Sequence, residues 1–227
     1  MEVIMSELIL SASSASNRVL RNTYWLLAAS LVPTIIGTWL GVALGFGALV
    51  AAAPIVFMLG FLAVAFGFIY VINKNRDSGA GVGLLLAFTG FMGLMLSPLI
   101  GTILGFANGV TLITIAAAGT GAIFAVAATL AGTIKRDVSS WGKFLMVGVI
   151  GLIIASLANI WLQIPALMLT VSVLAVVIFS AFLFYDVKRV IDGGETNYVS
   201  ATLSVYLSLF NIFQSLLSIL GITSRDE

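Results

Sequence analysis

The sequence predicts an all-α membrane protein in which seven transmembrane helices form one bundle. Hydrophobic residues make up 61% of the 227 positions and charged residues only 8%, whereas soluble domains carry about 25% charged residues. The apolar residues fall into runs long enough to span a bilayer, and the basic residues cluster in alternate connections between these runs. A surface with so few charges has to face lipid.

Seven apolar runs each reach the length of about 20 residues that a spanning helix needs. They are Tyr24–Phe46, Ala48–Ile72, Ala80–Gly105, Val110–Ile134, Lys143–Leu162, Ala166–Val187 and Tyr198–Leu220. Backbone polar groups in hydrocarbon have to bond within the chain, so continuous runs of this length favour helices over the shorter, alternating strands of a barrel. The spans define a transmembrane domain at 23–222, between a tail at 1–22 and a short tail at 223–227.

The basic residues predict the orientation of the chain. Nine of the ten lysines and arginines fall on one side if the chain crosses seven times, and only Arg225 falls on the other. Because basic loops stay in the cytoplasm, we expect a cytoplasmic N-terminus and a C-terminus on the opposite side. A six-span alternative, in which Tyr198–Leu220 is re-entrant, would place both termini inside.

Small residues recur at helical spacing in the first and third spans. They are Gly37, Gly41, Gly45, Gly90, Gly93, Gly101 and Gly105. Such ladders allow helices to approach closely in lipid. They predict tight packing within the chain, with a dimer seam as the alternative.

Two prolines interrupt the apolar runs, Pro33 in the first span and Pro98 in the third. A proline removes one helical hydrogen bond and usually kinks the helix. A structural bend and a conformational hinge at Pro98 are the two interpretations.

The last span carries a polar stripe with a period of three or four residues. Its members are Ser200, Ser204, Ser208, Asn211, Ser215 and Ser218. Because such a stripe is costly against lipid, it should face the interior of the bundle. Its residues either allow close helix packing or line a pathway for water or ions, in which Ser208 and Asn211 would belong to a gate or proton-sensing group.

Asp186, at the end of the sixth predicted span, is the acidic residue that we expect at membrane depth. It is interpreted either as a cap or ion pair at the boundary, or as a gate or proton-sensing group. Burial would raise the pKa of its carboxyl, whereas the neighbouring Lys188 and Arg189 would lower that pKa.

The composition argues against an enzyme. Cysteine and histidine are absent, which removes thiolate chemistry and the usual general base. No second aspartate lies in a predicted span to form a proteolytic pair, and the last span holds no lysine for a Schiff base. No phosphate-binding or zinc motif is present. We therefore expect no catalytic residues, cofactor or metal site, and the net charge of +1 argues against a nucleic-acid partner.

Several uncommon blocks occur in order along the chain. They are Val19–Tyr24, Ala158–Leu167, Phe184–Asp186, Gly193–Tyr198 and Val205–Phe213. With these blocks the chain resembles the transmembrane Bax inhibitor motif family, and most closely its bacterial branch that modulates the FtsH protease. The likeness covers nearly the whole chain and implies a seven-helix bundle with a central seventh helix.

The resemblance implies a function as well. Members of the bacterial branch lie in the inner membrane, bind the membrane-embedded protease FtsH and restrain its degradation of membrane proteins. The cytoplasmic N-terminal tail, here residues 1–22, is the part that the protease can grasp. We accordingly expect FtsH and the lipid bilayer as partners, and a periplasmic C-terminus.

Other members of the family imply an alternative function, a pH-influenced leak channel for calcium or other cations. In those members two aspartates share a proton. The first matches Asp186, but the second falls at Ser208, so this chain lacks the pair that tunes such a sensor. Calcium also prefers six to eight oxygen ligands rich in carboxylate, and the expected non-cytoplasmic loops carry no acidic residue.

Overall fold

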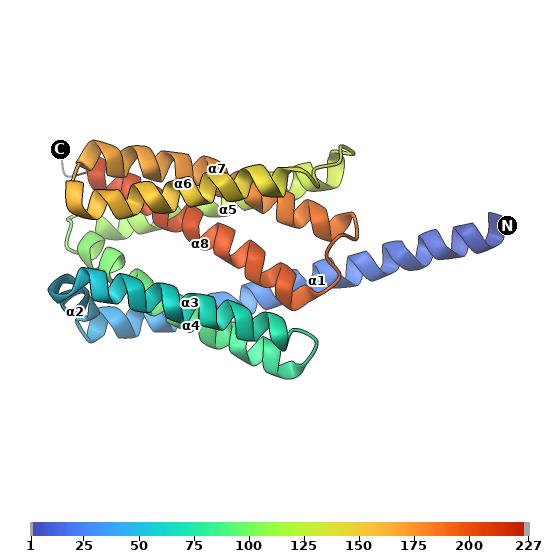
Figure 1. Ribbon diagram of the computed structural model, residues 1–227, viewed down its shortest axis with the longest axis horizontal. Coiled ribbons are helices and arrows are strands. Elements are labelled where there is room, and N and C mark those ends of the chain that lie inside the picture. Colours follow the sequence, from blue (N-terminus) through green and yellow to red (C-terminus); the bar gives the residue numbers. More distant parts are fainter. Residues whose placement is uncertain (1, 225–227) are drawn as a thin grey trace. The chain divides into compact units, whose positions relative to one another are not determined.

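The computed structural model describes residues 2–224, including the side chains from Ser16 onward, and every regular element within this range is an α-helix. The helices are α1 (Glu2–Ala43), α2 (Phe46–Ala52), α3 (Pro54–Lys74), α4 (Gly79–Leu104), α5 (Gly109–Thr133), α6 (Trp141–Leu162), α7 (Pro165–Ile191) and α8 (Tyr198–Thr223) (Figure 1). The short tail predicted at 223–227 lies largely outside the described residues.

The prediction of seven spanning helices is confirmed. Within residues 2–224, seven helices are long and apolar enough to cross a membrane, namely all except α2. Each corresponds to one of the predicted runs. The first predicted run, Tyr24–Phe46, lies almost wholly within α1, which runs without interruption from Glu2 to Ala43. The chain is therefore a multi-pass membrane protein.

The second span begins later than predicted. Instead of one helix from Ala48, the short α2 ends at Ala52 and α3 starts at Pro54. Ala53 between them has φ −147° and ψ 63°, outside the helical region. Proline lacks the N–H that an interior helical position would donate, so it is tolerated best in the first turn.

Gly45 has a different role from the one that its spacing predicted. It adopts φ +66° between α1 and α2, a left-handed conformation that glycine accepts at no steric cost. No atom lies within 4 Å of the position where its Cβ would be. Gly45 therefore allows the turn that ends the first span, and it does not extend the packing ladder.

The chain divides into two compact units. Unit 1 contains the residues up to Gly101 together with Arg189–Tyr206, and unit 2 contains Thr102–Lys188 together with the residues from Leu207 onward. α8 thus begins in unit 1 and ends in unit 2.

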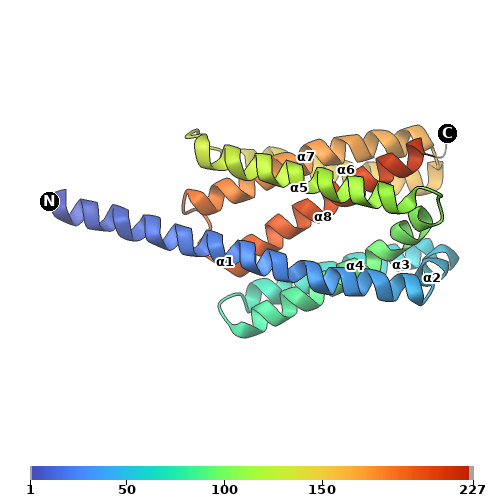
Figure 2. The ribbon, with the colours of Figure 1, turned by 180° about the vertical axis from the view of Figure 1, so that it is seen from behind.

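In unit 1, α1 packs on α4 through glycines. A Cβ at Gly37 would overlap the carbonyl oxygen of Gly90, and one at Gly93 would overlap that of Thr34. A Cβ at Gly41 would overlap the Ser97 hydroxyl. These contacts confirm close packing within the chain at three of the predicted glycines. The two helices run alongside one another in Figure 2.

Aromatic side chains join α3 to α4 on another side of unit 1. Phe61 stacks on Phe91 with ring centroids 6.0 Å apart, and Phe68 lies 5.6 Å from Phe88. The ring of Phe88 in turn meets Tyr206 of α8, edge to face, at 6.5 Å. α4 is therefore held by neighbours on several sides, which agrees with its many buried side chains.

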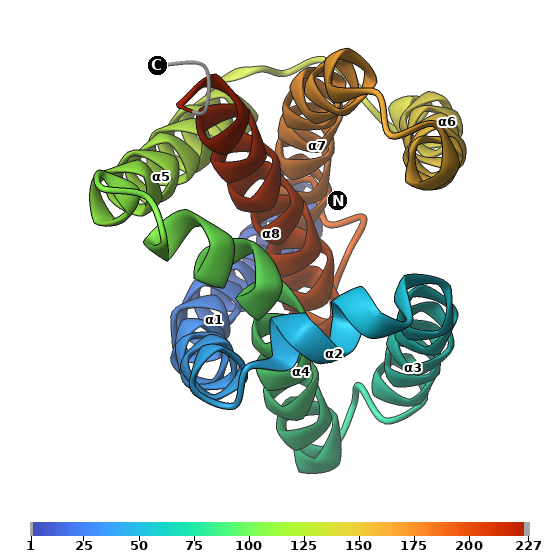
Figure 3. The ribbon, with the colours of Figure 1, turned by 90° about the vertical axis from the view of Figure 1, so that its left-hand side faces the viewer.

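In unit 2, glycines likewise allow close packing between α6 and α7, which lie side by side (Figure 3). A Cβ at Gly142 would stand 2.7 Å from the Tyr185 hydroxyl oxygen, and one at Gly148 would stand 3.0 Å from Cδ1 of Ile178. On α5, Gly119 faces Leu216 of α8. Small residues thus set the helix spacing in this unit too.

We predict that Gly37→Ala lowers the stability of the protein by about 1–3 kcal/mol, because the added methyl group meets backbone that cannot move aside. Thermal unfolding of the purified protein in detergent measures the effect as a lower Tm. Gly67→Ala is the matched control, since Gly67 lies in α3 with no atom within 4 Å of its Cβ position. Equal Tm values for the two variants would contradict the close approach of α1 to α4.

Candidate functional site

The polar stripe of α8 is buried or half-buried throughout. Ser200, Ser208 and Ser218 are at most 8% exposed, and the other members are half-buried. Ser200 and Ser204 belong to unit 1, whereas Ser208, Asn211, Ser215 and Ser218 belong to unit 2. The members of the stripe are thus divided between the two units.

Two members of the stripe make hydrogen bonds that explain their burial. The Ser200 hydroxyl donates to Oδ1 of Asn73 in α3 at 3.2 Å. Nδ2 of Asn211 donates to the Leu207 carbonyl of its own helix at 2.8 Å. Buried polar groups need such partners, so packing accounts for both residues. A pathway-lining role for the stripe stays a prediction.

Asp186 lies inside α7 and not at its end, because the helix continues to Ile191. Its side chain is 9% exposed, and Lys188 one half-turn further on is only 5% exposed. Asp186 and Ser208, the two positions that the resemblance predicts to match a shared-proton pair, are both buried and both belong to unit 2. A buried carboxylate within a candidate span is costly to keep, so a gating or proton-sensing role for Asp186 stays a hypothesis worth testing.

Pro98 sits within α4 without ending the helix. Proline leaves the carbonyl four residues earlier, that of Leu94, without its usual helical donor. The Ser97 hydroxyl supplies a replacement, since it donates to the Leu94 carbonyl at 2.7 Å. The neighbouring serine thus lets the helix continue through the proline. The conformational hinge stays a prediction.

The connection from α7 to α8 is built by the block Gly193–Tyr198. Gly193 takes φ +76° after the last turn of α7. The N–H groups of Gly194 and Glu195 donate to the Arg189 carbonyl at 2.8 and 3.1 Å, which satisfies the end of the helix. The Glu195 carboxylate lies 3.6 Å from the Arg189 guanidinium. This block closes α7 and sets the direction of the chain into α8.

Asn197 joins this connection to the one between α3 and α4. Its Oδ1 accepts the N–H groups of Val199 and Ser200 at 2.9 and 3.1 Å, which caps α8. Its Nδ2 donates to the carbonyl of Arg76 at 3.1 Å and to the carboxylate of Asp77 at 2.8 Å. One side chain therefore fixes two connections that the basic residues predict to be cytoplasmic. An asparagine just before an apolar run signals a cap, but nothing local signals its second pair of bonds.

Ser16 attaches α1 to the end of α7. Its hydroxyl lies 2.8 Å from the carbonyl oxygen of Val190 and 3.0 Å from that of Ile191. Both carbonyls belong to the last turn of α7, where the helix itself supplies no donor, and that of Val190 also accepts the Gly193 N–H at 3.2 Å. From this attachment α1 projects beyond the other helices of unit 1 towards its N-terminal end (Figures 1 and 2). The predicted tail is thus helical from Glu2 and is held to the rest of unit 1 at Ser16.

No group of three or more potential metal ligands occurs among the residues that the structure describes. Several side-chain hydrogen bonds of unit 1 lie at the end that carries Ser16, Asn73, Asn197 and the connection at Arg76 and Asp77. They fix the backbone of the α3–α4 and α7–α8 connections and attach α1 to the last turn of α7.

The comparison with known families agrees with this architecture. The profile of the family described as "Inhibitor of apoptosis-promoting Bax1" matches residues 16–225. The chain belongs to the Bax inhibitor family. The resemblance found in the sequence blocks is thereby confirmed.

Relatives in this family cover nearly the whole chain. "Modulator of FtsH protease YccA" of Escherichia coli K12 is 38% identical over 218 residues, which are 93% of each protein. A protein of E. coli O6:H1 with the same identity and coverage is named "Inner membrane protein YccA". An uncharacterised protein of Neisseria meningitidis serogroup A is 41% identical over 209 residues, 91% of each.

We predict that Asn197→Ala destabilises the protein by about 1–2 kcal/mol, because α8 loses its cap and the Asp77 carboxylate loses a donor. Thermal unfolding in detergent measures the loss, and hydrogen exchange should rise in the α3–α4 connection. Asn108→Ala is the control, because Asn108 precedes α5 without a side-chain capping bond. If both variants unfold at the same temperature, the bridging role of Asn197 is wrong.

Proposed function

We propose that this chain is a bacterial inner-membrane regulator that binds the membrane-bound protease FtsH and restrains its degradation of membrane proteins. The observation that carries the proposal is the likeness to the E. coli modulator of FtsH protease over 93% of both chains. The likeness thus extends over nearly the whole of both proteins.

The geometry of unit 1 supports this proposal. A regulator needs a part that the protease can engage without the whole bundle unfolding. α1 provides such a part, since it projects from the bundle and is attached at Ser16 to the last turn of α7. The basic residues Arg18 and Arg21 close to this attachment predict that it lies on the cytoplasmic side. Restraint by binding also requires no catalytic group.

We predict that overexpression of the full chain lengthens the half-life of a membrane-protein substrate of FtsH, and that the chain co-purifies with the protease from detergent-solubilised membranes. Deletion of residues 2–15 should reduce both effects several-fold, because the projecting part of α1 is lost. Pulse-chase labelling measures the half-life, and immunoblotting measures the co-purified protease.

Two point variants refine this experiment. Ser16→Ala keeps the whole tail but removes its bonds to Val190 and Ile191, and should weaken co-purification in part. Thr114→Ala is the control, because the Thr114 hydroxyl bonds only within α5, to Val110. The proposal fails if the full chain, present in the membrane at high level, leaves the substrate half-life unchanged.

The leak of calcium or another cation remains the alternative function, and the observation in its favour is the burial of Asp186 within a candidate span. We predict that any flux through the protein in liposomes falls on Asp186→Asn, measured with an entrapped ion indicator across a range of pH. Asp137→Asn is the matched control, because Asp137 is exposed in the α5–α6 connection. Unchanged flux would remove Asp186 as the gate, and absence of flux would remove the pathway.

A further inference from the structure

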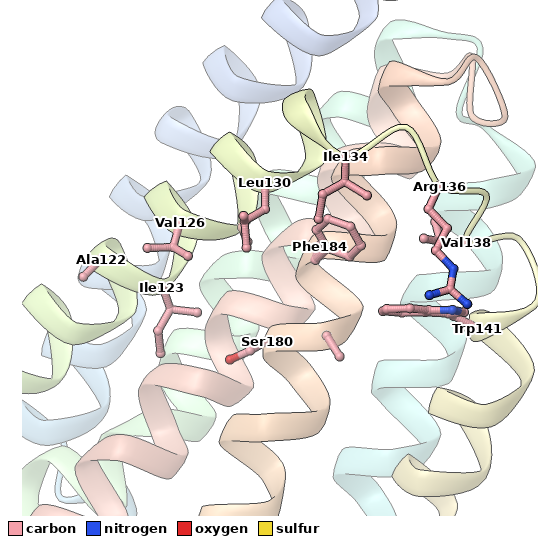
Figure 4. A pocket seen from close by; sticks show the side chains of 12 residues that line it. Ala122, Ile123, Val126, Leu130, Ile134, Arg136, Val138, Trp141, Ser180 and Phe184 are labelled. Atoms are coloured by element: carbon pink, nitrogen blue, oxygen red, sulfur yellow. The ribbon is translucent and has the colours of Figure 1, made fainter.

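Unit 2 contains an apolar groove between the C-terminal half of α5 and α7, with a volume of about 670 Å³. Its walls include Val126 and Leu130 from α5, Ile134 directly after α5, and Ser180, Ala181 and Phe184 from α7 (Figure 4). The Ser180 hydroxyl donates to the Val176 carbonyl at 2.6 Å, so it offers little to a ligand. The groove therefore suits a hydrocarbon occupant.

The groove is open at its side. Val126, Leu130 and Ile134 are 58%, 44% and 38% exposed, although they are large aliphatic residues. α5 and α7 are both candidate spans, so we expect this open side to face the bilayer interior. Lipid chains are the molecules present there.

The length of the groove matches one leaflet. From Ala122 to Ile134, both of which line it, α5 rises about 18 Å at 1.5 Å per residue. Half of the hydrocarbon core of a bilayer measures about 15 Å. An acyl chain that enters at one face of the membrane would therefore fill the groove down to the bilayer midplane.

One end of the groove carries a positive charge. Arg136 and Trp141 line the groove where the chain leaves α5, and the Arg136 side chain points toward the Trp141 ring (Figure 4). The Trp141 ring packs at 5.9 Å from Phe184. Tryptophan is enriched at the headgroup level of membranes, and basic pockets at helix ends bind lipid headgroups.

The charges around Arg136 leave this end basic. Lys135 precedes it and Lys143 follows in the first turn of α6, and both are exposed. The acidic neighbour is Asp137, whose carboxylate accepts the Ser139 N–H at 2.8 Å. That bond is the main cause that holds the pKa of Asp137 below its ordinary value. The Asp137 carboxylate thus remains charged but is bound within its own connection.

We propose that this groove binds one acyl chain of an anionic phospholipid, with the lipid phosphate held by Arg136. An apolar helix of another protein would satisfy the walls of the groove, but it carries no anionic group for the basic end. A phospholipid satisfies both the apolar walls and the basic end. This site is independent of the contact with the protease.

Native mass spectrometry of the purified full chain tests the proposal, with phosphatidylglycerol and phosphatidylcholine added in equal amounts. We expect the chain to retain phosphatidylglycerol several-fold more than phosphatidylcholine. Arg136→Gln should abolish this preference, because the phosphate loses its partner. Lys74→Gln is the control, since it removes one exposed positive charge at the end of α3 and Lys74 does not line the groove.

A second variant tests the apolar part of the site. Ala181→Phe places a ring in the groove and should lower the retention of both lipids, and its Tm in detergent shows whether the fold persists. Should this variant fail to fold, Leu130→Trp at the exposed wall replaces it.

Three results would overturn the proposal. The first is equal retention of the two lipids by the unmodified chain, and the second is a preference that survives Arg136→Gln. The third is a groove-filling variant that folds and retains lipid normally but no longer co-purifies with a protein partner, which would assign the groove to a helix of that partner.

Discussion

Polar groups within hydrocarbon have to find partners inside the protein, and this constraint governs how the chain uses its many serines and threonines. Ser30, Thr120 and Thr202 each donate to the carbonyl four residues earlier, at 2.7–2.8 Å. Among the described residues, no buried side-chain nitrogen or oxygen lacks a hydrogen-bond partner. A hydroxyl that bonds to its own helix can be placed against another helix at little cost. The polar stripe of α8 is consequently compatible with packing alone, and its period does not by itself indicate a channel.

The sequence predicts the spans well because the bilayer imposes their length and composition. Hydrophobic length carries no information about a single non-helical residue, however, and this is why the break at Ala53 is missing from the prediction. Pro54 is the local signal of that break, since proline favours the first turn of a helix. Gly45 shows the same limitation. Its spacing from Gly37 and Gly41 predicts packing, whereas its position at the end of the apolar run determines its left-handed conformation.

The groups that organise the predicted cytoplasmic end depend on contacts between distant parts of the chain. Asn197 bonds to Arg76 and Asp77, about 120 positions away, and Ser16 bonds to Val190, 174 positions away. A serine in a helix has no pattern that reveals a partner so distant. The groove in unit 2 is equally hidden, because its residues lie in uniformly apolar runs and only the fold brings α5 beside α7. Asp186 could be singled out from the sequence because a carboxylate is rare at membrane depth, but its position inside α7 required the structure.

Burial of apolar surface gives little specificity to a contact within a membrane, since lipid chains are as apolar as the side chains they would be exchanged for. Trp25 and Phe144 are 73% and 78% exposed, and in a bilayer such residues are already satisfied by lipid. A protein partner must therefore be recognised by close packing or by polar groups. In this chain nine of the ten basic residues lie in the first helix up to Arg21, in the connections of the predicted cytoplasmic face, or in the helix turns that border them. Polar groups suited to a selective contact are therefore found in the predicted cytoplasmic connections, and in unit 1 Asn197 and Ser16 order the backbone of such connections.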